Sequence, residues 1–196
     1  MAERACAYTH MDVRDADSFG KIAFNNEQLE LEHLGHIVEN DIIRFALIKE
    51  LEQHPTATLM FDTEYQQIHQ SESDVFITLK SGEPIIAKLL VAADGANSAI
   101  RKQFNMALSF KDYDHHALVA TVKTKEPHAN TARQVFLPTG PLAFLPLSDD
   151  NTHSIVWSTS PNHCDELLAM DDTPFNKAVM AAIDGQCGLC EVQSKR

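Results

Sequence analysis

The segment LLVAADGANSAIR, residues 89–101, places a carboxylate, a glycine and two capping residues directly after an apolar run. Gly95 lets the backbone turn sharply and removes the Cβ that would obstruct a ligand. Asn97 or Ser98 can cap the N–H groups of a following helix, which otherwise favour an anion. With Asp94 at the end of the apolar run, the pattern indicates the edge of a nucleotide-binding site.

Arg101 follows about one helical turn later and supplies a guanidinium that suits phosphate. An ordinary strand–turn–helix with a solvated arginine explains the same residues, because Asp-Gly turns are common. Asp184-Gly185 illustrates this alternative, since it follows a helical pattern and is expected only to end that helix. The local pattern leaves both interpretations open.

The elements around this corner follow from hydrophobic periodicity. In open α/β sheets, ligands bind beyond the carboxyl ends of parallel strands. The apolar run before Asp94 predicts such a strand, central and buried on both faces, and residues 97–104 predict the next helix. Upstream, apolar residues four apart in 41–53 predict an amphipathic helix, and ATLMF, residues 57–61, predicts a short strand.

The second half of the chain changes character. Four strand patterns joined by polar or Pro/Gly turns predict an antiparallel sheet, and two helices follow, the second with Thr173 as its N-cap. The strand patterns lie at 115–124, 133–137, 142–148 and 153–160, and two more lie at 11–15 and 20–24. The predicted fold class is therefore α+β with α/β pieces: a partial α/β domain at 1–108, and an antiparallel sheet with helices at 109–196.

Composition excludes several classes of function. The net charge of −12 opposes binding to nucleic acid and weak attachment to anionic membranes. No apolar run approaches the roughly 20 residues of a spanning helix, and the N-terminal segment lacks the apolar core of a secretory signal. The four cysteines are too scattered for a disulfide framework. We expect a cytoplasmic protein.

AADGANSAIR resembles the second dinucleotide-binding motif, the Asp-Gly motif, of the flavoprotein aromatic hydroxylases. DADSFGKIAF, HLGHIVEN, ARQVF and LAFLPLSD resemble the ubiquinone-biosynthesis branch, the polyprenylphenol hydroxylases. The resemblance implies a doubly wound FAD domain joined to a sheet-based substrate domain. It also implies a monooxygenase that hydroxylates a polyprenylated phenol with FAD, O2 and NAD(P)H.

The resemblance also implies roles for individual residues. Asp94 and Gly95 would line the path of the ribityl chain and pyrophosphate of FAD, and Arg101 would support the phosphates. His36 would open a helix near those phosphates; a capping or surface histidine is the alternative. Phe144 and Pro146 are candidates for an apolar substrate pocket, although core packing is the commoner explanation for any single one of them.

Two glycine motifs of that family are missing. None of the seven glycines is spaced G-x-G, and no Gly-Asp dipeptide occurs. We expect an internal piece of a longer protein, whether engineered, from a truncated gene or from proteolysis. Alone, it should bind FAD weakly or not at all, and should self-associate through its unpaired strand edge. Peripheral association with the inner membrane or with a biosynthetic complex is a further expectation. The competing hypothesis is a non-catalytic module for binding lipid or quinone, or for assembly.

The remaining clusters favour no metal site. His115 and His116 would point to opposite faces of a strand and cannot share an ion. Cys187 and Cys190 have C-x-x-C spacing, but no second pair completes a zinc site, so a zinc or thiol-redox role is the lesser alternative.

Overall fold

The computed structural model describes residues 4–196. The chain forms two compact units, one made of Met1–Ile48 with Asp112–Arg196 and the other of Lys49–Lys111. These units differ from the two consecutive segments expected from sequence, 1–108 and 109–196. The difference arises because strands near the N-terminus pair with strands of the second half.

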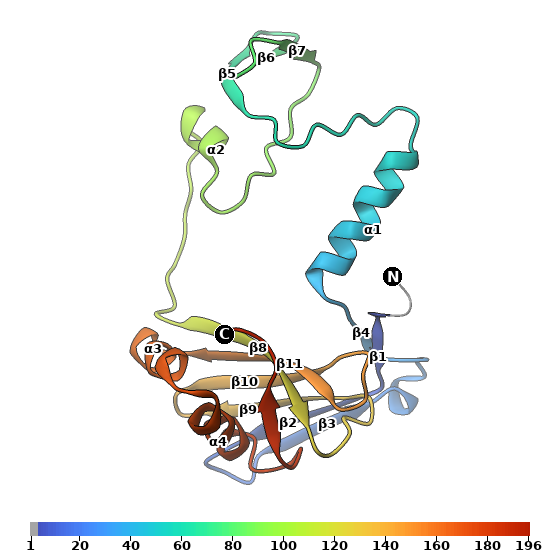
Figure 1. Cartoon of the computed structure of the whole chain (residues 1–196), viewed down its shortest axis with the longest axis vertical. Helices are drawn as coiled ribbons and strands as arrows, with labels where there is room; N and C mark the ends of the chain where they lie inside the picture. The colour runs from blue at the N-terminus through green and yellow to red at the C-terminus, as the bar shows by residue number, and fades with distance from the viewer. Residues whose placement is uncertain (1–3) are drawn as a thin grey trace. The chain divides into compact units, whose positions relative to one another are not determined.

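The larger unit is built on a seven-stranded sheet with the order β12-β8-β11-β10-β9-β2-β3 (Figure 1). All neighbouring strands run antiparallel except β2 and β9, which are parallel. The predicted antiparallel sheet with helices is therefore confirmed, with β2 and β3 added to its edge. The strand bounds are β2 His10–Asp15, β3 Lys21–Asn25, β8 His116–Thr124, β9 Thr131–Leu137, β10 Gly140–Pro146, β11 Thr152–Thr159 and β12 Cys190–Val192.

One face of this sheet forms the core. Side chains along β8, β10 and β11 alternate between buried and more exposed, as the two-residue period of a strand requires. The buried set packs with α3 (Pro161–Ala169) and α4 (Asp172–Ala182), which Figure 1 shows together beside the sheet. Leu142, Phe144 and Ile155 are wholly inaccessible to solvent.

Both helices begin after a polar N-cap residue, and the first of them has a side-chain cap hydrogen bond. Ser160 caps α3, and Pro161 stands in its first turn as the sequence predicts. The predicted cap of α4 is wrong, because that helix starts earlier and Asp171 is its N-cap, not Thr173. Pro174 is tolerated inside the first turn, where backbone N–H groups have no intrahelical partner. As predicted, Asp184 and Gly185 end α4 with positive φ values of 55° and 65°.

The same unit holds a small two-stranded sheet, β1 (Cys6–Tyr8) with β4 (Gly35–Ile37), and a short 3-10 helix, η2 (Glu27–Leu29). The predicted helix, α1, spans Asn40–Gln53. Its apolar stripe is not buried, since Ile43, Leu47 and Leu51 are 39%, 60% and 44% exposed. No helix within residues 4–196 is long and apolar enough to cross a membrane.

The smaller unit is a three-stranded antiparallel sheet, β5-β6-β7, with the short helix α2 (Ala99–Gln103). Its strands span Tyr65–Gln70, Val75–Leu79 and Pro84–Ala87. The Gln103 side chain joins α2 to β5 by donating to the Ile68 carbonyl at 2.7 Å.

Two strands expected in this unit do not form. Residues 57–61 and 88–94 have no strand conformation, and Leu89 and Val91 are 76% and 74% exposed. A strand is held by ladder hydrogen bonds to a neighbour, and nothing among residues 49–111 pairs with these segments. The predicted buried central strand is therefore wrong for this chain.

Candidate functional site

The Asp-Gly corner of the smaller unit has the backbone geometry that the sequence predicts. Gly95 has φ of +86°, a conformation that side-chain-bearing residues rarely adopt. A Cβ added there would meet no atom within 4 Å. The glycine is therefore required by its backbone conformation, and its surroundings leave open space for a ligand.

The Asp94 carboxylate is occupied in capping α2. One oxygen accepts from the Ser98 hydroxyl at 2.6 Å, and the other accepts from the backbone N–H groups of Ala99 and Ile100 at 2.8 and 3.3 Å. The Ser98 hydrogen bond, more than any other contact, holds the pKa of Asp94 below its usual range. Ser98 also accepts from the N–H of Arg101 at 2.9 Å and is the N-cap of the helix.

These bonds change what the corner can offer a phosphate. The first N–H groups of α2 already have partners, and the helix has only five residues. The Arg101 guanidinium turns back and donates to the Ala96 carbonyl at 2.5 Å. Asp94 also does not end a parallel strand, because residues 88–94 form none. Within this chain the corner therefore offers a ligand an open glycine turn beside a carboxylate that is already engaged in capping α2.

His36 does not begin a helix. It lies in β4, opposite Ala7 of β1, and α1 begins four residues later at Asn40. Its ring is stacked edge-on against His33, with centroids 4.2 Å apart. His36 is exposed and belongs to the larger unit, whereas Asp94, Gly95 and Arg101 belong to the smaller one. The arrangement agrees with the surface-histidine alternative.

Phe144 and Pro146 lie in the core. Both side chains are fully buried on the face of β10 that packs with α3 and α4. Periodicity correctly separates them from Ala143 and Leu145 on the other face, but it does not tell which face the helices cover. This placement favours the packing alternative for both residues.

The opposite face of the sheet carries a row of side chains that sequence periodicity alone does not reveal. Strand register places one residue from each of six adjacent strands in line. Five are apolar, and the end members Val119 and Ile22 are 53% and 58% exposed. This apolar row comprises Val119, Val156, Ala143, Gln134, Val13 and Ile22.

The apolar row leaves partly exposed apolar side chains on one face of the sheet, where an apolar ligand can pack. We define it as the candidate substrate face. Finding it requires the pairing register of strands that are far apart in sequence, such as β2 and β9.

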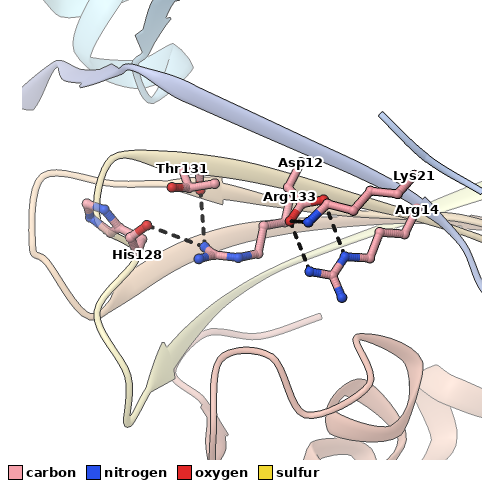
Figure 2. A network of polar contacts seen from close by, with 6 residues as sticks. All are labelled: Asp12, Arg14, Lys21, His128, Thr131 and Arg133. Carbon is pink, nitrogen blue, oxygen red and sulfur yellow. Dashed lines mark hydrogen bonds and ion pairs between the residues drawn. The ribbon is translucent and has the colours of Figure 1, made fainter. Parts of the chain in front are cut away.

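A charged cluster lies on the other face, beside β2, β3 and β9 (Figure 2). The Asp12 carboxylate accepts from Arg14 at 3.1 and 3.3 Å and from the Lys21 ammonium at 3.3 Å. Partial burial acts to raise the pKa of Asp12, but the hydrogen bonds from the two cations outweigh it and the pKa is lowered. The Arg133 guanidinium donates, at 3.4 Å each, to the carbonyls of His128 and Thr131.

This cluster borders a cavity of about 430 Å³ that Arg14 and Lys21 line together with the end of α4. Asp12 balances one of these two positive charges, and the carboxylates of Asp15 and Asp184 also line the cavity, so the arrangement is that of a structural ion cluster with little net positive charge left for a ligand.

The cysteines of the C-x-x-C segment are buried. Burial raises the pKa of the Cys187 thiol, and it raises that of Cys190 to about 12. Both thiols are therefore protonated at neutral pH, which disfavours nucleophilic or redox chemistry. Within residues 4–196, no three His, Cys, Asp or Glu side chains are grouped so that they could hold a metal ion.

Comparison with known proteins connects both units to flavoproteins. A family model described as the FAD binding domain matches residues 16–194. The ubiquinone biosynthesis monooxygenase COQ6 of Danio rerio is 40% identical over 190 residues, covering 91% of this chain and 39% of that protein. The 3-demethoxyubiquinol 3-hydroxylase of Escherichia coli is 35% identical over 150 residues, covering 76% of this chain and 38% of that protein. The chain thus spans about two fifths of the length of these relatives.

A solved structure shares the fold. PqsL of Pseudomonas aeruginosa, in complex with 2-aminobenzoylacetate, aligns with a TM-score of 0.77 at 16% identity. The alignment covers 97% of this chain and 56% of PqsL. At this identity the likeness concerns the fold alone.

Proposed function

This chain belongs to the FAD binding domain family, and from that premise we propose that it is part of an enzyme that hydroxylates a polyprenylated phenol, as its likeness to ubiquinone-biosynthesis monooxygenases supports. The observation that carries the proposal is the 40% identity to COQ6 over 91% of the chain. FAD, when bound, would supply the oxygen-activating chemistry, with NAD(P)H as the electron source.

Within that enzyme, the residues of this chain would bind and orient the cofactor and the substrate. Asp94 and Gly95 would border the ribityl and pyrophosphate part of FAD, with Arg101 released from the Ala96 carbonyl to face phosphate. Residues 88–94 would become a strand of a doubly wound FAD domain only beside parallel neighbours, which residues 49–111 do not provide. His36 is a weaker candidate for the phosphate side, because it stands in a strand.

The substrate would lie on the apolar row of the sheet. Strand alternation gives the sheet two faces, of which one can pack on helices and the other can receive the phenol. Since α3 and α4 pack on the Phe144 face, the apolar row takes the place of Phe144 and Pro146 as the proposed contact surface. Its exposed valine and isoleucine side chains suit a prenyl tail. The cytoplasmic location, with peripheral attachment at the inner membrane, stays a prediction.

A chimera tests this function. The segment of the Escherichia coli hydroxylase that aligns with this chain is replaced by the corresponding residues from here. We expect a flavin-loaded protein that oxidises NAD(P)H in a substrate-dependent way and forms hydroxylated product. In the chimera, Asp94→Ala should lower flavin content, whereas Asn97→Ala, a change at an exposed neighbour, should not. A flavin-loaded chimera that binds the phenol without substrate-dependent oxidation would favour the non-catalytic module instead.

The chain alone gives a second test. Because the Asp-Gly corner is only one edge of a cofactor site, a titration of this chain with FAD should show a weak perturbation of the flavin absorbance spectrum, or none. Tight binding with a perturbed spectrum would contradict this expectation.

A further inference from the structure

Gln134 interrupts the apolar row near its middle. Its neighbours across the sheet are Ala143 of β10 and Val13 of β2. Along β9, the neighbours on the same face are Ala132 and Phe136, because side chains two apart point the same way. The Gln134 carboxamide therefore has four apolar side chains as its nearest neighbours on this face of the sheet.

The Gln134 side chain has no partner in the structure. Its side chain is half-buried, and across residues 4–196 its carboxamide makes no hydrogen bond or ring contact. Arg133 and Asp12 lie on the opposite face by strand alternation, whereas the Asp15 carboxylate, opposite Phe136 on the Gln134 face, accepts from the Asp17 N–H at 2.9 Å. A primary amide carries two donors and an acceptor, so Gln134 offers both kinds of group where an apolar ligand would lie.

Because its neighbours are apolar, the Gln134 amide should favour ligands that carry a polar partner for it over ligands that lack one. Covering the amide with a ligand that lacks a polar partner would leave it desolvated and unpaired, which is unfavourable. A ligand with a hydroxyl or ether oxygen at that point satisfies it. An apolar pocket that contains one well-placed polar group fixes the orientation of its ligand in this way.

We propose that Gln134 is a positioning residue, which hydrogen-bonds an oxygen substituent on the substrate ring while the prenyl tail lies along the apolar row. This inference rests on the proposed function, because it assumes that the apolar row is the substrate surface. The row crosses six strands, which at the usual strand spacing is about 24 Å. That length accommodates the ring at Gln134 and several prenyl units beside it.

The test compares two ligands on the full chain. One probe is a phenol with a short prenyl chain, and the other is the same prenylated benzene without the ring oxygen. Dissociation constants are measured for the unmodified chain, for Gln134→Leu and for Ser154→Ala, a matched change on the same face of β11. Amide NMR spectra follow the side-chain NH2 signals of Gln134 during each titration.

We expect the unmodified chain to bind the phenol about tenfold more tightly than the oxygen-free analogue, as one hydrogen bond allows. Gln134→Leu should remove this preference without weakening the analogue, and Ser154→Ala should keep it. The Gln134 NH2 signals should shift only with the phenol.

Three results would count against the inference in different ways. Equal binding of both probes, or a preference that survives in Gln134→Leu, would overturn the role of Gln134 and leave the apolar surface standing. NMR shifts confined to other parts of the chain would overturn both Gln134 and the apolar row. If neither probe binds, the substrate surface of the proposed function fails as well.

Discussion

His153 is a buried histidine in β11 that lacks a full set of partners. Its Nδ1 lies 3.4 Å from the Thr124 hydroxyl, whereas its Nε2 is buried with no hydrogen-bond partner within the described residues. Its ring packs against His128 and Phe144. Desolvation by burial, followed by the charges of His128 and Arg133, lowers the pKa of His153 to about 3.

This histidine should make the fold sensitive to acid. In the unfolded chain it binds a proton below about pH 6.5, whereas the folded chain excludes that proton down to about pH 3. The contribution of neutral His153 to the free energy of unfolding is therefore fully present above about pH 6.5 and is lost progressively as the pH falls below that value. Between pH 7 and pH 5, His153 should contribute a loss of about 2 kcal/mol in the free energy of unfolding.

Urea unfolding at both pH values measures this loss. His153→Gln should reduce it by about that amount, and His116→Gln, which replaces an exposed histidine of β8, should leave it unchanged. Equal pH dependence in all three proteins would show that His153 is not the group responsible.

Ser98 controls both the start of α2 and the charge of Asp94. Its hydroxyl donates to the Asp94 carboxylate and accepts from the Arg101 N–H. Ser98→Ala should cost about 1 kcal/mol in the stability of the smaller unit, and should raise the pKa of Asp94 toward its usual value. Because folding lowers the pKa of Asp94, the ionised carboxylate stabilises the folded state fully above about pH 4. This stabilisation is lost as the pH falls through the lowered pKa.

NMR titration of the Asp94 carboxyl, with denaturant unfolding, checks this prediction. Asn97→Ala is the control, since Asn97 is an adjacent exposed residue. A pKa for Asp94 that does not move in Ser98→Ala would show that the backbone N–H groups alone hold the carboxylate.

At the scale of elements, successive residues of β10 point alternately into the core and toward the candidate substrate face. Phe144 is fully buried with α3 and α4, whereas Leu145 is half-buried on the opposite face. Phe144→Ala should therefore destabilise the protein by about 3–5 kcal/mol, through lost burial and an internal cavity. Leu145→Ala should cost about 1 kcal/mol or less. Equal losses in denaturant unfolding would mean that both faces of the sheet are covered.

Hydrophobic periodicity predicts the longer elements of this chain correctly but not all of the short ones. The strands at 116–124 and 152–159 and helix α1 were predicted nearly to their ends, because their patterns extend over several turns or alternations. The runs at 57–61 and 88–94 have strand composition but no strand conformation. Composition describes what a strand would bury, and a partner decides whether the strand forms.

At the scale of the whole chain, the exposed apolar segments predict self-association. In the smaller unit, Leu89, Val91 and Phe110 are 76%, 74% and 82% exposed, and exposed apolar surface favours association between chains. We expect sedimentation velocity to show oligomers that grow with concentration, and Val91→Lys to shift the distribution toward monomer. Glu72→Lys, a charge change at an exposed site away from this segment, should not. A monomer at all concentrations would contradict the prediction.

The Asp-Gly turn, the Ser98 cap of α2 and the succession from β8 to β11 followed by α3 and α4 were determined by the sequence alone, because they depend on residues close together in the chain. Family membership was also readable there, from motifs in order. Tertiary structure decided that β2 and β3 join the sheet of the second half, that the Phe144 face is the covered one, and that Gln134 stands in an apolar row. These facts depend on pairing register between distant strands and on which face the helices cover, and neither leaves a local pattern in the sequence.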